Sequence, residues 1–379
     1  SIRFGQRDEI ALKESVRASF VLILGVTLLL NGLAFACLDL IKSFLQVPDD
    51  VWGDMRAYIA IVFAGIFATF LYNYFASYLR AVGNSVVPLV FLAVSAVLNI
   101  ALDLWFVIGL NFGVAGAAGA TVIAQYVSGI GIMICALLKC PQLRALCSRS
   151  PIHASRIREI AGYSILTCVQ QSVMNLGILM VQGLVNSFGA AVMAAFAAAV
   201  KIDAFAYMPV QDFGNAFSTF IAQNYGAGKP ERIWLGIKAS VLMMIIYAAF
   251  TFVLLMSGAK YFALIFVDPS ETEILLDTEL FLHISCMFFP VLGLLCVLRY
   301  TIQGVGFTNL AMFSGVAEMI ARILVSLYAV PAFGFLAVCY GDPLAWIAAD
   351  LFLVPAFIYV YKRLKKQVLT NASVTQAVA

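Results

Sequence analysis

The sequence carries few charges. Asp, Glu, Lys and Arg make up only 11% of its 379 residues, whereas soluble domains carry about 25%. A chain this poor in polar side chains cannot cover a water-soluble globule, so a soluble domain is excluded. The formal net charge is +3, and no basic stripe alternates with aromatic side chains, as single-stranded nucleic acid would require. We therefore expect no nucleic-acid partner.

Histidine is also scarce. The two histidines, His153 and His283, stand far apart, and no Ser, His and Asp or metal ligands gather at matching depths. The eight cysteines show neither metal-ligand spacing nor a disulfide framework. The chain opens without Met and without a charged and then apolar leader, so no signal peptide is predicted. An enzyme is not expected, and neither is a metal site or an organic cofactor.

Long apolar runs are abundant instead. Hydrophobic residues make up 63% of the chain, and a helix of about 20 such residues crosses a bilayer core. The sixth run is longer than a bilayer requires and contains Pro209 and Gly214, so a bend is predicted there. The sequence predicts an all-α integral membrane protein with ten transmembrane helices, at residues 18–45, 55–80, 86–109, 114–138, 160–187, 190–222, 237–258, 277–302, 310–333 and 343–361.

Basic residues gather in alternate loops. Lys and Arg in short loops resist translocation, so the side that holds most of them is predicted to be cytoplasmic. The opposite side holds only Lys42, Arg56 and Lys260 beside several acids. Both ends of the chain are therefore predicted to be cytoplasmic. The basic side consists of Arg3, Arg7, Lys13, Arg17, Arg80, Lys139, Arg144, Arg149, Arg156, Arg158, Lys229, Arg232, Lys238, Arg299, Lys362, Arg363, Lys365 and Lys366.

Two stretches of the chain match in order, with a nearly constant offset between their members. Each matching pair holds the same place relative to a predicted helix, which indicates an internal repeat. The pairs are Phe4-Gly5 with Tyr225-Gly226, Leu12–Val16 with Ile237–Val241, Val47–Asp49 with Val267–Pro269, Ala81–Gly83 with Gly304–Gly306, and Ser95–Asn99 with Ser314–Glu318.

The second repeat has two helices before Tyr225-Gly226, whereas the first has almost no chain before Phe4-Gly5. We expect two further helices upstream of Ser1 and six plus six in the intact protein. An even number per repeat orients both copies alike, about an axis along the membrane normal, which predicts two lobes and alternating access. The predicted domains are an N-terminal lobe of four helices at 1–138, a basic cytoplasmic linker at 139–159, and a C-terminal lobe of six helices with a short basic tail at 160–379.

The segment Ala204–Pro209 and the sequence Gln-Asn-Tyr-Gly-Ala-Gly-Lys at 223–229 resemble bacterial members of the MATE (multidrug and toxic compound extrusion) family. Leu79–Ser85 and Pro88 support the resemblance, which covers the whole chain. It implies a twelve-helix fold of two lobes in the bacterial plasma membrane and a monomer. It also implies export of amphipathic or cationic drugs and toxic organic compounds in exchange for H⁺ or Na⁺.

The coupling ion is predicted from where acids stand in this family. Proton-type members use an aspartate on the first helix, which would lie upstream of Ser1. Sodium-type members use carboxylates on the helices that correspond to the fifth and eighth spans. Residues 160–187 hold no acid, and neither do residues 283–299. The usual sodium site is therefore not expected, and proton coupling is favoured.

Charges inside predicted spans are the leading site candidates, because each costs at least about 2.5 kcal/mol to insert. They are Lys201, Asp203, Asp212, Glu318 and Arg322. Glu318 and Arg322, four residues apart on a helix, can form a pair. That pair is either structural or a gate that opens when Glu318 takes up a proton. Lys201 and Asp203 point apart, so one of them is expected to face a cavity, and Lys201 can instead bond helix-end carbonyls or an acid.

Neutral polar residues are the second group of candidates. Gln171 and Asn175 on the fifth span could line a cavity that accepts many cargoes, or could bond across helices together with Gln170. A packing or capping role is expected for Asp103. The weaker candidates are Asn99, Asp103, Tyr72 and Asn73.

Two alternatives to drug export are compatible with the sequence. A flippase for lipid-linked oligosaccharides or polysaccharides would need a strongly cationic cavity for pyrophosphate, and only Lys201 and Arg322 are predicted cations within the membrane. The other alternative is a truncated, transport-incompetent product that lacks two helices.

Overall fold

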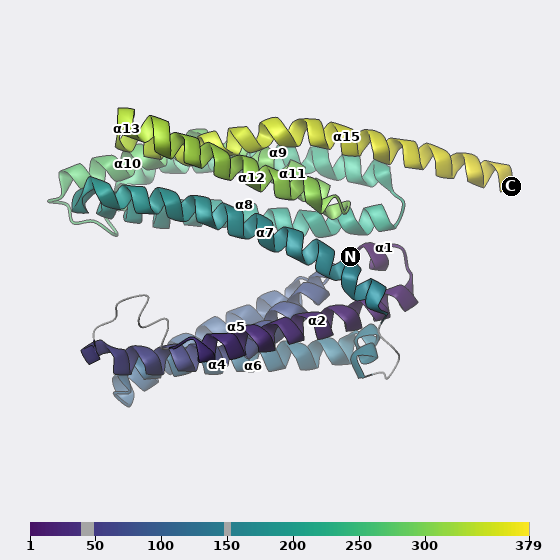
Figure 1. Ribbon diagram of the computed structural model, residues 1–379, viewed down its shortest axis with the longest axis horizontal. Helices are drawn as coiled ribbons and strands as arrows, with labels where there is room; N and C mark the ends of the chain where they lie inside the picture. The colour runs from purple at the N-terminus through teal and green to yellow at the C-terminus, as the bar shows by residue number, and fades with distance from the viewer. Residues whose placement is uncertain (39–48, 148–152, 379) are drawn as a thin grey trace. The chain divides into compact units, whose positions relative to one another are not determined.

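The computed structural model describes residues 1–38, 49–147 and 153–378, and these residues form helices and no strand (Figure 1). Among them, nine helices are long and apolar enough to span a membrane, and a bent pair of helices makes ten if the pair counts as one span. The structure confirms the prediction of an all-α membrane protein.

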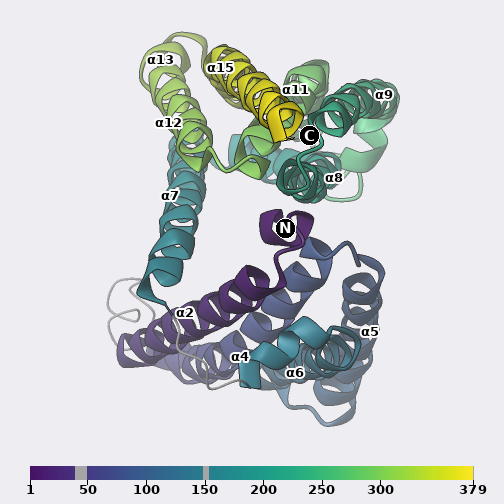
Figure 2. The same ribbon diagram turned by 90° about the vertical axis from the view of Figure 1, so that its right-hand side faces the viewer.

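The chain divides into two compact units. The first unit holds residues Arg7–Ala161, and the second holds Ser1–Gln6 together with Gly162–Ala379. The predicted boundaries differ at two places. Helix α1 (Ile2–Gly5) packs against α8 (Ala190–Gly226), so the first six residues belong to the second unit (Figure 2). The whole range predicted as a linker, 139–159, falls within the first unit, where the 3₁₀ helix η2 (Pro141–Cys147) packs against α2 (Glu9–Ala36).

The first unit consists of α2, α4 (Asp49–Ala81), α5 (Val86–Asp103) continued by the π-helix η1 (Leu104–Gly109), and α6 (Gly113–Lys139). Helix α2 begins well before the predicted span because the Asp8 side chain caps it, accepting a hydrogen bond from the Ala11 amide at 3.0 Å. Gly129 of α6 lets α4 approach closely, since a Cβ there would lie 2.8 Å from the Ala68 carbonyl oxygen. Lys42 and Arg149 lie outside the described residues.

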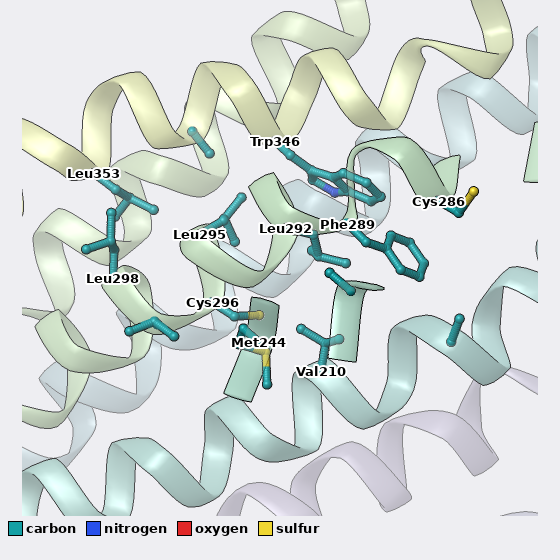
Figure 3. Packing of buried hydrophobic residues seen from close by; sticks show 14 of the residues in the cluster. Val210, Met244, Cys286, Phe289, Leu292, Leu295, Cys296, Leu298, Trp346 and Leu353 are labelled. Carbon is teal, nitrogen blue, oxygen red and sulfur yellow. The ribbon is translucent and has the colours of Figure 1, made fainter. Parts of the chain in front are cut away.

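In the second unit, α11 (Phe289–Gly304) is the central helix. It contacts α8, α9 (Pro230–Ala263), α12 (Thr308–Leu324) and α15 (Gly341–Val378), and most of its residues are buried. The other elements are α7 (Ala154–Val185), which belongs to this unit from Gly162 onward, η3 (Asn186–Phe188), α10 (Thr272–Met287), the π-helix η4 (Val325–Ala329), α13 (Val330–Phe333) and α14 (Phe335–Cys339). The core that α11 organises includes Val210, Met244, Phe289, Leu292, Leu295, Trp346 and Leu353 (Figure 3).

Proline acts differently in two helices of the second unit. The predicted eighth span is broken into α10 and α11, which are bent by 49°, because Pro290 lies in the first turn of α11 and has no amide hydrogen to donate backwards. The bend predicted at Pro209 and Gly214 does not interrupt α8, which runs from Ala190 to Gly226. Gly214 serves close packing, since a Cβ there would overlap the ring of Tyr300.

Arg299 is not a loop residue, and its assignment to the cytoplasmic loops was wrong. It lies within α11 and is only 3% exposed. Arg299 lies near the end of its predicted span, which suggested a cation that flanks the helix. In the structure, Ser314 and Glu318 accept hydrogen bonds from its guanidinium and hold it inside the unit.

Candidate functional site

Four charged side chains meet inside the second unit. The carboxylate of Glu318 accepts a hydrogen bond from Arg299 Nη2 on one oxygen and from Arg322 Nη1 at 3.4 Å on the other. Arg322 Nε also donates to Asp342 Oδ1 at 2.9 Å, and Arg299 Nε donates to Ser314 Oγ at 3.0 Å. The chain Arg299, Glu318, Arg322 and Asp342 alternates in sign, so its formal charges balance.

Glu318 holds this network together. It is 1% exposed, and both arginines are 3% exposed. Removing one partner from a buried ion pair costs about 3–5 kcal/mol, because the other charge stays buried without compensation. The structure confirms the predicted pairing of Glu318 with Arg322. Arg299, which was not predicted to take part, is a second cation bonded to Glu318.

Small residues bring α7 against this network. A Cβ on Gly177 of α7 would lie 3.2 Å from Arg322 Cδ, and one on Gly315 of α12 would lie 3.0 Å from Gln170 Cγ. Glycines at such crossings allow helices in a membrane to approach closely. Gln303 Nε2 then donates to Gln170 Oε1 at 2.9 Å, which links α11 to α7. The cross-helix role considered for the glutamines of the fifth span therefore applies to Gln170.

A polar stripe runs along one face of α8. Asp203, Tyr207 and Gln211 follow one another at intervals of four residues, so they lie on the same side of the helix. Asp203 Oδ1 accepts a hydrogen bond from Ser285 Oγ of α10 at 2.7 Å. Gln211 donates to the Tyr207 hydroxyl and accepts from the Tyr300 hydroxyl of α11 at 2.7 Å. Through this stripe, α8 offers polar groups to both halves of the bent pair.

Asp350 is a further buried acid, on α15. It is 8% exposed, and neither of its carboxyl oxygens makes a hydrogen bond to any residue that the structure describes. Asp350 was not among the predicted site residues, although it lies inside the predicted tenth span and a charge inside a span was the signal for the other candidates. Asp342 was missed because it immediately precedes that predicted span.

The remaining strong candidates form no hydrogen bond or salt bridge with the ion network among the described residues. The Lys201 ammonium sits 5.8 Å from the centre of the Phe266 ring, a cation–π contact in place of the carbonyl or acid partner considered for it. Lys201 and Asp203 thus have different neighbours, in agreement with their predicted divergence. Asp212, Gln171 and Asn175 are exposed on their helices, and their proposed role in a cavity stays a prediction.

The weaker candidates belong to the first unit. Asn99 Nδ2 donates to Thr121 Oγ1 at 3.3 Å, and the Tyr72 hydroxyl donates to the Pro88 carbonyl at 3.0 Å. Asn73 is exposed. Asp103 makes no capping hydrogen bond, and its buried Oδ1 has no hydrogen-bond partner in the described part of the chain. These groups form separate contacts and not a shared site.

Comparison with known proteins gives a consistent result. The MatE family model matches residues 1–105 and 164–328. "Probable multidrug resistance protein YpnP" of Bacillus subtilis strain 168 is 27% identical over 80% of this chain and 67% of its own length. "Probable multidrug resistance protein YoeA" of the same strain is 25% identical over 96% of this chain and 80% of its own length. A crystal structure of MATE in the bent conformation superimposes with a TM-score of 0.87, at 18% identity, over 97% of this chain and 82% of that one.

Proposed function

The chain belongs to the MatE family, and we propose that it exports amphipathic or cationic organic compounds by alternating access, in exchange for protons. The family consists of transporters, so the protein is a transporter and not an enzyme. Its relatives come from bacteria, and a multi-span helical protein of this kind resides in the inner membrane. Both ends in the cytoplasm, and no cofactor beyond the coupling ion, are part of the proposal.

The observation that carries proton coupling is a pair of acids, Asp203 and Asp350, that form no salt bridge with any residue the structure describes. Asp203 is held only by a hydroxyl group, that of Ser285, among the contacts of the described residues. Asp350 has no hydrogen-bond partner there. Such carboxyl groups can take up and release a proton without breaking an ion pair, whereas Glu318 is bonded to two guanidinium groups. We assign the coupling role to Asp203 first and to Asp350 second, and a structural role to Glu318.

The charge balance of the second unit argues against a flippase for lipid-linked sugars. Arg299 raises the number of buried arginines to two, but Glu318 and Asp342 neutralise both. A pyrophosphate would have to compete with these bonded carboxylates for each guanidinium. The relatives described as multidrug resistance proteins also favour a small organic cargo.

Ethidium transport into inverted membrane vesicles tests the proposal. The chain is expressed as printed and also extended by its upstream coding sequence. We expect ethidium uptake that stops when the proton gradient is collapsed and persists when the sodium gradient alone is collapsed. Asp203→Asn should abolish this uptake, whereas Asp103→Asn should leave it nearly unchanged. Uptake indifferent to both gradients in both forms would refute coupled export, and equal effects of the two substitutions would refute the assignment of Asp203.

A further inference from the structure

A pocket of about 310 Å³ opens at one end of the second unit, between the first turns of α9 and the last spanning turns of α15. Ile233 and Ile237 of α9 form one wall, and Phe357, Val360 and Leu364 of α15 form the other. This volume is within the range of small-molecule sites, which begins at about 300 Å³. No residue of the ion network or of the polar stripe on α8 lines the pocket.

The walls of the pocket are mostly apolar, and its polar lining residues are Glu231, Trp234, Thr301, Tyr361 and Lys365. Thr301 of α11 reaches it, but the Thr301 hydroxyl already donates to the Val297 carbonyl at 2.6 Å. A peptide bound here would leave most of its backbone amides and carbonyls without partners, at a large cost. A hydrocarbon chain has no such groups, so the walls favour an acyl chain.

The mouth of the pocket has the residues of a membrane–water boundary. The rings of Trp234 and Tyr361 lie 5.3 Å apart, and each residue is 38% exposed. Trp and Tyr concentrate at the headgroup level of bilayers. The spanning part of α9 begins at Pro230, and that of α15 ends at Lys365. The pocket therefore leads from the headgroup level toward the hydrocarbon core.

The charge at this boundary is strongly positive. Lys365 and Glu231 both line the pocket, but residues 229–238 and 357–365 together contain six basic residues and only this one acid. The Lys238 ammonium lies 5.4 Å from the centre of the Trp234 ring, and the Arg363 guanidinium lies 5.2 Å from the centre of the Phe307 ring. Basic clusters of this kind beside membrane helices attract anionic headgroups and repel cationic amphipaths.

We propose that this pocket binds one acyl chain of an anionic phospholipid, with the lipid phosphate at Lys365. The site is a structural lipid site on the leaflet that the basic loops face. It does not depend on the cargo or on the coupling ion of the transporter.

Fluorescence quenching by brominated lipid tests this proposal directly. Trp52, Trp105 and Trp346 are replaced by Phe, so that Trp234 at the pocket mouth is the remaining tryptophan of the four. The full chain is reconstituted in phosphatidylcholine vesicles that contain increasing amounts of brominated phosphatidylglycerol or brominated phosphatidylcholine. We expect phosphatidylglycerol to quench Trp234 at about fivefold lower mole fraction, the preference that one basic residue near the surface provides.

Three variants of that protein identify the site. Lys365→Gln, at an exposed position, should remove the preference, and Lys260→Gln at the far end of α9 should keep it. Glu231→Gln should strengthen it, because the one acid at the mouth is neutralised. Equal quenching by the two lipids in the parent, or an unchanged preference in Lys365→Gln, would overturn the proposal. Competition by a cationic lipid as strong as that by phosphatidylglycerol would also overturn it.

Discussion

The two units share local geometry but differ in buried charge. Gly83 (φ 90°) and Gly306 (φ 99°) adopt the same left-handed turn, and they are paired in the predicted repeat. Each follows a helix and precedes one that ends in a π-helix, η1 or η4. Yet the second unit buries Arg299, Glu318 and Arg322, while the first has Ala76, Asn99 and Asp103 at the matching positions of its repeat.

The difference shows which buried groups the arrangement of helices requires and which are found in the second unit alone. The first unit closes around Ala76, which is fully buried, and joins its helices through uncharged bonds such as Asn99 to Thr121. Buried ions are therefore not required by the arrangement of helices. We infer that the second unit uses its ion network to join α11, α12 and α15, where the first unit uses uncharged contacts, and the predictions below test this inference.

The largest effect is expected from breaking the ion network at Arg299. Arg299→Ala leaves Glu318 buried with only the longer bond to Arg322, so the unfolding free energy should fall by about 3–5 kcal/mol. Thermal unfolding of the purified protein measures the loss. Asp212→Asn, at an exposed position of α8, is the control and should change stability little.

A double variant tests whether the ions can be replaced together without loss of stability. In Arg299→Met with Glu318→Leu, the two opposite charges are removed together, and such replacements are often neutral or stabilising. We expect its stability to return most of the way toward that of the parent, because the first unit packs uncharged Ala76 where the second has Arg299. A double variant as unstable as Arg299→Ala would show that the second unit needs these ions to fold, and the comparison would fail.

An intermediate effect is expected where equivalent residues of the two repeats meet. Gly5 of α1 lies against the carbonyl of Gln223 on α8, and Gly226 of α8 lies against the carbonyl of Ile2 on α1, each without room for a Cβ. Gly5 and Gly226 belong to the first matching pair of the predicted repeat. The contact is therefore reciprocal, as in a pair related by a twofold axis.

Gly5→Ala and Gly226→Ala should each push α1 away from α8 and cost about 1–3 kcal/mol, as overpacking usually does. Cleavage by a protease near Arg7 should become faster in both. Gly183→Ala is the matched control, because a Cβ there meets nothing within 4 Å and alanine favours a helix over glycine. Two variants with parent-like cleavage would mean that the contact is not tight, and different effects in the two would mean that it is not reciprocal.

The sequence predicted the spans well because membrane helices depend on length and hydropathy, which are local properties. A bend was predicted at Pro209, where the helix is continuous, and no break was predicted at Pro290, where the helix is broken. Whether a proline breaks a helix depends on its neighbours in space, which the sequence does not show. Glu318 and Arg322 were found as a pair because they share one helix. Arg299, the third member, comes from another helix, and no pattern along the chain joins residues so far apart. Asp350 could have been found, since its position within a predicted span was sufficient.

The smallest effect is expected at one backbone position that is occupied by Arg7 in the first repeat and by Gly228 in the second. Arg7 (φ 57°) and Gly228 (φ 65°) both adopt the left-handed conformation, each two residues after one of the paired glycines. This conformation costs a residue with a Cβ about 1–2 kcal/mol and costs glycine nothing, although glycine loses more entropy on folding. Arg7→Gly should therefore stabilise the protein by up to about 1 kcal/mol, and Gly228→Ala should destabilise it by about the same amount. Melting temperatures that shift in opposite directions would support equivalent backbone geometry at the two sites, whereas destabilisation by both substitutions would show that the Arg7 side chain contributes more than its backbone strain costs.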